Sequence, residues 1–164
     1  MEVCPDEAPA RETTALAFIG DPELRESIRL DLSAANRDLA QGEWKGATVL
    51  AGSAIEALFL WALEEHEKRN PGSRAPAIAT LRANGRLTRQ PDPNPEWWHL
   101  PQYVEVAEHL GLIKPETAIA VRLAKEFRNL IHPGRVARLG QKCDRATALQ
   151  ALAAAEAVVR DLGS

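Results

Sequence analysis

Cysteine is scarce in this chain, and its histidines are not grouped as metal ligands. Two cysteines, Cys4 and Cys143, occur among 164 residues, which argues against a structural disulfide and fits a reduced, cytoplasmic protein. His99 and His109 have no Cys, Asp or second His at ligand spacing, and His66 lacks the partner His of a zinc protease helix. A glycine-rich phosphate loop is also missing. We therefore expect no metal site and no cofactor.

Long hydrophobic runs are also absent. The longest apolar stretch, residues 47–63, is interrupted by Gly52, Ser53 and Glu56, whereas a membrane helix needs about 18 to 20 consecutive apolar residues. The first residues, MEVCPDEAP, are acidic and lack the basic and apolar regions of a signal peptide. We therefore expect a cytoplasmic protein with no membrane segment. Apolar residues still make up 45% of the chain, enough for the core of one domain.

Apolar residues recur at helical spacing along most of the chain. Asp21 and Pro22 form a typical helix start, because Asp can accept free amide N–H groups and Pro suits the first helical position. The spacing predicts helices at about 22–40, 43–69, 76–84, 101–110, 115–132 and 144–161. We find no stretch that alternates as a strand does. The prediction is an all-α bundle of four to five main helices.

These helices predict a single domain at 21–164 that follows a flexible leader at 1–20. Residues 70–99 form a connecting segment rich in Pro and Arg. The helix at 43–69 is apolar on nearly every face, which indicates a buried central helix. The residues expected to face the core in the last two helices are Ile119, Leu123, Phe127, Leu130 and Ile131, then Ala146, Leu149, Leu152, Ala153 and Ala157.

Chemistry is concentrated in residues 126–134, EFRNLIHPG. Arg128 and His132 are four residues apart and would share one face of a helix. The free carbonyls at a helix end favour a protonated imidazole, which can act as a general acid or base. A guanidinium can grip a phosphate, and Asn129 could orient either group. These groups suit metal-independent RNA cleavage by the 2′-hydroxyl. The alternative is that His132 caps the helix and Arg128 pairs with an acid.

Several other side chains have both a functional and a structural reading. Segment 122–145 has seven basic and two acidic residues, so Arg135, Arg138 and Lys142 could hold an RNA backbone, or the charges could spread around the helix and loop. Glu56, within an apolar helix, could pair with Arg128 or face solvent. Trp97 and Trp98 could stack on bases, or anchor the core or an interface.

The motif Arg128-Asn129-Leu-Ile-His132-Pro-Gly-Arg, with an Ala-rich helix after it and a small-residue helix before it, resembles the HEPN superfamily (higher eukaryotes and prokaryotes nucleotide-binding domain). The resemblance covers roughly residues 22–162 and extends more loosely to Glu56. It implies a HEPN-like bundle in which Arg128 and His132 are the catalytic pair. It also implies a homodimer that brings two motifs into one cleft.

The resemblance makes an RNA-directed protein the leading hypothesis, as a metal-independent endoribonuclease of toxin or phage-defence type. A toxin would have an antitoxin-type protein partner. Three residues separate Arg128 from His132, fewer than in the usual motif. This spacing favours an alternative, a non-catalytic module for dimerisation or for binding a nucleotide or protein. A third hypothesis is structural, in which Arg128 and His132 hold two helices together through Glu56.

Overall fold

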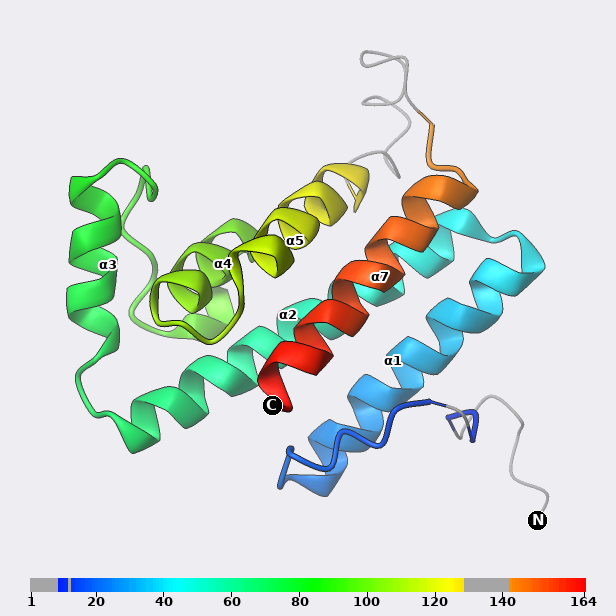
Figure 1. The fold of residues 1–164 in the computed structure, drawn as a ribbon, viewed down its shortest axis with the longest axis horizontal. Helices are drawn as coiled ribbons and strands as arrows, with labels where there is room; N and C mark the ends of the chain where they lie inside the picture. Colours follow the sequence, from blue (N-terminus) through cyan, green and yellow to red (C-terminus); the bar gives the residue numbers. More distant parts are fainter. Residues whose placement is uncertain (1–8, 12, 129–141) are drawn as a thin grey trace.

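The computed structural model describes residues 9–11, 13–128 and 142–164, with only the backbone of Phe127 and Arg128. Within these ranges the chain forms helices and no strand, so the all-α prediction is confirmed (Figure 1). One short 3-10 helix, η2, accompanies the six α-helices of the described part. Their bounds are α1 Pro22–Gln41, α2 Trp44–Arg69, α3 Arg74–Ala83, η2 Pro95–Trp97, α4 Leu100–His109, α5 Pro115–Arg128 and α7 Arg145–Leu162.

The helix starts follow from local hydrogen bonding. The Asp21 carboxylate accepts the N–H groups of Glu23 and Leu24 at 2.9 and 3.2 Å, which caps α1 as the sequence predicts. At the start of α7, Asp144 accepts the Thr147 N–H at 3.0 Å. Gly42 ends α1 with φ of 84°, a left-handed conformation that glycine adopts without strain.

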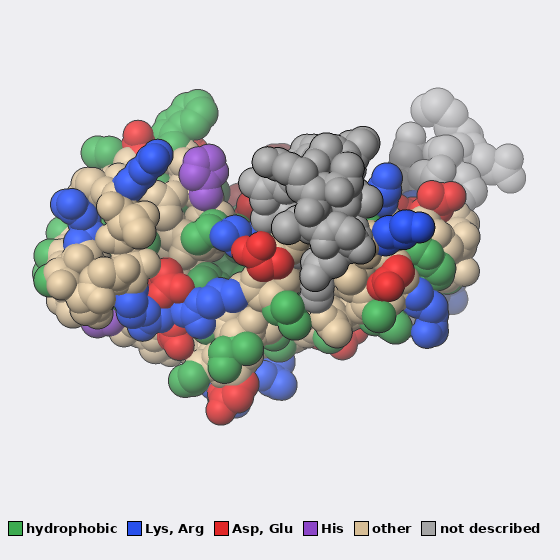
Figure 2. Space-filling model, turned by 90° about the horizontal axis from the view of Figure 1, so that it is seen from above, with side chains coloured by type: hydrophobic (Ala, Val, Ile, Leu, Met, Phe, Trp, Pro, Cys, Tyr) green, Lys and Arg blue, Asp and Glu red, His purple; other side chains and the backbone are tan. Residues whose placement is uncertain are grey.

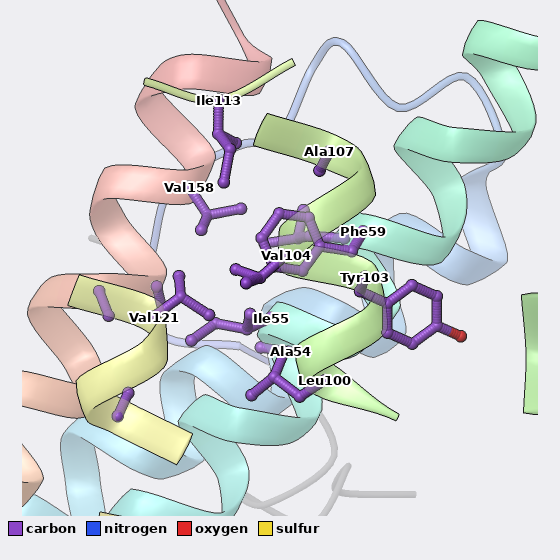
Figure 3. Packing of buried hydrophobic residues seen from close by; sticks show 14 of the residues in the cluster. Ala54, Ile55, Phe59, Leu100, Tyr103, Val104, Ala107, Ile113, Val121 and Val158 are labelled. Carbon is purple, nitrogen blue, oxygen red and sulfur yellow. The ribbon is translucent and has the colours of Figure 1, made fainter. Parts of the chain in front are cut away.

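Helix α2 is the centre of the bundle. It packs against α1, α4, α5 and α7, and Figure 1 shows it running behind α7 along the length of the molecule. Ile55 and Phe59 of α2 are fully buried and meet side chains of α4, α5 and α7 (Figure 3). By length and composition α2 is the one helix in the described part that could span a membrane, with mean hydropathy 1.6. Its most apolar window is 56% buried, as expected for a core helix.

The connecting segment at 70–99 forms part of the packed structure. Glu67, near the end of α2, accepts the N–H groups of Gly72 and Arg74 at 2.6 and 3.1 Å and so fixes the start of α3. Burial works to raise the pKa of Glu67, but these N–H groups outweigh it and the pKa is lowered. Leu81 and Leu87 of this segment are buried. Helix α3, which belongs to this segment, packs against α4.

The second half of the leader also contributes to the core. Leu16 and Ile19 are buried in the main hydrophobic cluster. The Ala10 N–H donates to the Ser33 hydroxyl at 2.9 Å, and the Arg29 Nε donates to the Thr14 carbonyl at 3.0 Å. These contacts attach Ala10 and Thr14 to α1.

The prediction of the buried face of α5 is wrong at two positions. Ile119 and Leu123 are 64% and 45% exposed, whereas Ala118, Val121 and Ala124 are buried. Small side chains let two helix backbones approach closely, and α5 packs on the alanine-rich side of α7. The buried residues of α7 are Ala148, Ala151, Leu152, Ala154, Ala155, Val158 and Asp161.

The prediction of the buried face of α7 is also wrong at three positions. Leu149 is 38% exposed, and Ala146 and Ala153 are also exposed, although the sequence predicts them in the core. Leu152 is buried as predicted.

Asp161, near the end of α7, fixes the start of α5. Its side chain is 3% exposed, and Oδ2 accepts from the Lys114 N–H at 2.9 Å and the Thr117 hydroxyl at 2.6 Å. Its Oδ1 lies 3.1 Å from an Arg160 guanidinium nitrogen. Burial works to raise the pKa of Asp161, but Thr117, Lys114 and Arg160 outweigh it and the pKa is lowered. The α5–α7 pair is therefore held by a buried polar cap as well as by apolar contact.

Candidate functional site

The Arg-His motif begins at the end of α5. Arg128 is the last residue of that helix, and its side chain, like Asn129, His132, Arg135 and Arg138, lies outside the described residues. The geometry of the proposed catalytic group therefore stays a prediction. What the structure describes is the pair of helix ends between which the motif runs.

Three helix ends surround the start and end of the motif segment. Helix α5 ends at Arg128 and α7 starts at Arg145, and the two helices pack on each other (Figure 1). The Cys143 Sγ, just before α7, lies 3.4 Å from the Thr48 hydroxyl near the start of α2. The starts of α2 and α7 therefore lie side by side. Lys142 is exposed immediately before this contact.

Glu56 is half-buried on α2, and its negative charge acts on Tyr103 of α4. Burial raises the pKa of Tyr103 to about 12, and the negative charge of Glu56 adds to this rise. The Tyr103 hydroxyl donates to the Pro95 carbonyl at 2.5 Å. Pairing of Glu56 with Arg128 stays a prediction because the Arg128 side chain is not described.

Part of the predicted basic patch has a structural role. Arg122 lies 2.8 Å from Glu105 and 2.5 Å from Glu108, both on α4, and Arg86 pairs with the same two carboxylates. Burial works to raise the pKa of Glu108, but the two arginines outweigh it and the pKa is lowered. Arg122 therefore joins α5 to α4.

The rest of the described surface carries charges of both signs. Lys125 Nζ lies 3.3 Å from a Glu126 carboxylate oxygen. In Figure 2, Lys and Arg side chains alternate with Asp and Glu side chains on the described part of the upper face. Of the basic residues predicted to hold RNA, Lys142 is exposed, and Arg135 and Arg138 lie outside the described residues. In the described part of segment 122–145, Arg122 and Lys125 are therefore paired with carboxylates and do not form a purely positive surface.

The two adjacent tryptophans lie in different surroundings. Trp98 is 5% exposed and Trp97 is 71% exposed. They precede α4, whose first turn lies beside the last turns of α5 around a hollow of about 220 Å³. The residues that line this hollow are Leu100, Pro101, Val104, Glu105, Val121, Arg122, Lys125 and Glu126. Trp97 therefore precedes the turn of α4 that lies beside the last turns of α5.

A larger cavity, of about 770 Å³, lies between α1, α7 and the N-terminal segment. Its walls combine apolar side chains such as Leu32 and Leu152 with polar ones such as Asn36, Arg37 and Glu156. The sequence gives no signal for this cavity, because α1 and α7 are far apart in the chain. It arises because both helices pack on α2 and make few contacts with each other.

Within residues 9–11, 13–128 and 142–164, no group of three or more His, Cys, Asp or Glu side chains is placed to hold a metal ion. Comparison of the chain with protein-family models, with curated proteins and with solved structures found no match. The resemblance to the HEPN superfamily therefore rests on the sequence motif.

Proposed function

We propose that this chain is an RNA-directed HEPN-like protein that acts as a metal-independent endoribonuclease of toxin or phage-defence type. The observation that supports the proposal is that Arg128 is the last residue of α5. A motif at such a helix end has a negative dipole beneath it, which favours a protonated His132.

The proposed reaction assigns each motif residue a separate task. A His132 imidazole takes the proton of the RNA 2′-hydroxyl, whose oxygen then attacks the adjacent phosphorus. The Arg128 guanidinium stabilises the negative charge that builds on the phosphoryl oxygens. The bond to the 5′-oxygen breaks, and a protonated imidazole donates a proton to that leaving oxygen. Asn129 orients the phosphate or the imidazole, while Arg135, Arg138 and Lys142 hold the RNA backbone.

A homodimer would supply the base and the acid from two copies of His132. Ile119 and Leu123 are one turn apart on α5, and both are exposed, as is Leu149 on α7. These helices are the ones that flank the motif segment, so a second copy that covers the three side chains would lie close to it. Exposed large apolar side chains on adjacent elements are typical of protein interfaces. An antitoxin-type protein that binds the same face would block the dimer.

The test is incubation of purified protein with mixed cellular RNA in EDTA, beside Arg128→Ala and His132→Ala variants. We expect cleavage by the wild type and none by either variant, with circular dichroism unchanged. Glu126→Ala, an exposed residue of the same turn, is the matched control and should keep full activity. Cleavage that survives in His132→Ala, or that requires a divalent metal, would contradict the proposed mechanism.

The cavity between α1 and α7 favours a second candidate function, a non-catalytic binding module. Its volume of about 770 Å³ lies in the range of small-ligand pockets, and Arg37 and Asn36 on its wall could bind an anionic nucleotide. This function predicts no RNA cleavage and a rise in Tm with a nucleotide panel. Ala40→Trp, which would fill the cavity, should abolish that rise. A rise that persists in Ala40→Trp would place the ligand elsewhere.

A further inference from the structure

The exposed side chain of Trp97 has no structural role that its neighbours explain. Trp98 provides the core anchor, since its Nε1 donates to the Asp92 carbonyl at 2.7 Å and its ring lies 5.7 Å from that of Tyr103. Trp97 in contrast is 71% exposed, the most exposed large apolar side chain in the described part of the protein. An indole presented to solvent in this way is available to a ligand.

The backbone of Trp97 is fixed even though its ring is exposed. The Asn94 side chain accepts the Glu96 N–H at 3.1 Å, and the Trp97 N–H donates to the Asn94 carbonyl at 3.2 Å. The carbonyl of buried Pro95 accepts both the Trp98 N–H at 2.9 Å and the Tyr103 hydroxyl at 2.5 Å. The short helix η2 is thereby attached to α4, so a ligand on Trp97 would order little backbone.

The position of Trp97 relates it to the end of α5. Leu100, three residues later, lines the hollow of about 220 Å³ together with Lys125 of α5. Three residues span at most about 11 Å between α-carbons. Lys125 in turn is less than one helical turn from Arg128. The α-carbon of Trp97 is therefore at most about 11 Å from that of Leu100, on the wall of the hollow that the last turns of α5 also line.

Charges around the indole favour a base over a phosphate. Asp92 and Glu96 lie in the same turn, and Asp92 accepts the Asn94 N–H at 2.8 Å. These carboxylates repel phosphate, whereas the flat face of a nucleobase carries no net charge. Lys125 and Glu126, on the far side of the hollow, are 39% and 62% exposed. The charges beside Trp97 therefore favour contact with the uncharged face of a base over contact with a phosphate.

We propose that Trp97 is a stacking platform for an unpaired nucleobase of the RNA that the motif cleaves, which makes it a substrate-positioning residue. This inference rests on the proposed function. Stacking uses the face of the base and not its hydrogen-bonding edge, and a base inside a double helix has both faces covered by its stacked neighbours. The substrate class is therefore single-stranded RNA with weak base preference at the stacked position.

The test uses the full-length His132→Ala protein, which binds without cleavage, and a fluorescently labelled single-stranded RNA oligonucleotide. Trp97→Ala should weaken binding about 5- to 150-fold, the usual effect of losing one base–aromatic stack. Trp97→Phe should keep most of the affinity. Tryptophan fluorescence should be quenched by RNA in the parent and in a Trp61→Phe control, but not in Trp97→Phe.

Three outcomes would overturn the platform. If the parent binds RNA and Trp97→Ala binds it equally well, Trp97 is not a platform while the proposed function stands. If the parent binds no RNA, the proposed function fails and the platform with it. If Trp97→Ala dissociates the protein into monomers in size-exclusion chromatography, Trp97 is a protein-interface residue.

Discussion

Replacement of Asp161, near the end of α7, should destabilise the protein. The side chain is 3% exposed, and it accepts from the Lys114 N–H and the Thr117 hydroxyl at 2.9 and 2.6 Å. Asp161→Ala leaves both donors without this acceptor, and a buried donor left unsatisfied costs about 1 to 3 kcal/mol. Because Lys114 can regain some hydration, we expect a total loss of about 2 to 4 kcal/mol.

Asp161→Asn separates the contribution of charge from that of hydrogen bonding. The amide oxygen can still accept one or both donors, so we expect a smaller loss of about 1 to 2 kcal/mol. The assay is urea unfolding followed by circular dichroism, with the midpoint and slope fitted together. Glu156→Ala, an exposed carboxylate on the same helix, is the control and should change stability by less than about 0.5 kcal/mol.

The pH dependence gives a second readout for Asp161. Its pKa is lower in the folded protein than in the unfolded chain, so the carboxylate stabilises the fold above the unfolded pKa, near 4. This stability is lost as the pH falls through the lower, folded pKa. Asp161→Asn should therefore flatten the fall in stability below about pH 4. An Asp161→Ala variant within 0.5 kcal/mol of the wild type, or an unchanged acid profile in Asp161→Asn, would refute the reasoning.

Three further predictions follow from other contacts. Arg122→Ala should lower the free energy of unfolding by about 1 kcal/mol in urea unfolding, because Arg86 remains beside the same carboxylates and the site is partly exposed. An unchanged free energy of unfolding would show that Arg122 adds no stability. Tyr103→Phe should cost about 1 to 2 kcal/mol and remove the loss of stability between about pH 10 and 12, because the raised pKa of Tyr103 keeps the folded hydroxyl neutral there. Ile119→Lys and Leu123→Lys should each convert the proposed homodimer to a monomer in light scattering with circular dichroism unchanged, because both side chains are exposed on α5. A dimer that persists in both variants would place the interface elsewhere.

One part of the candidate site was predicted from the sequence, and another part was found only in the structure. The sequence predicts Arg128, Asn129 and His132 as the catalytic group, and in the structure Arg128 is the last residue of α5. The mutual geometry of the three side chains is not described, so their roles stay predictions. The exposed Trp97, the role of Arg122 as a pairing partner for α4 and the cavity between α1 and α7 are additions that come from the structure.

The sequence by itself determined where most helices begin and end. Those limits depend on contacts within a few residues, such as the Asp21 carboxylate on two N–H groups and the left-handed Gly42. Which residues become buried was decided only by tertiary packing. On α5 both Ile119 and Val121 are apolar, and α7 covers the side with smaller residues because the backbones can then approach closely. Trp97 and Trp98 are likewise adjacent residues of the same type. Only packing against α4 buries Trp98 and leaves Trp97 exposed.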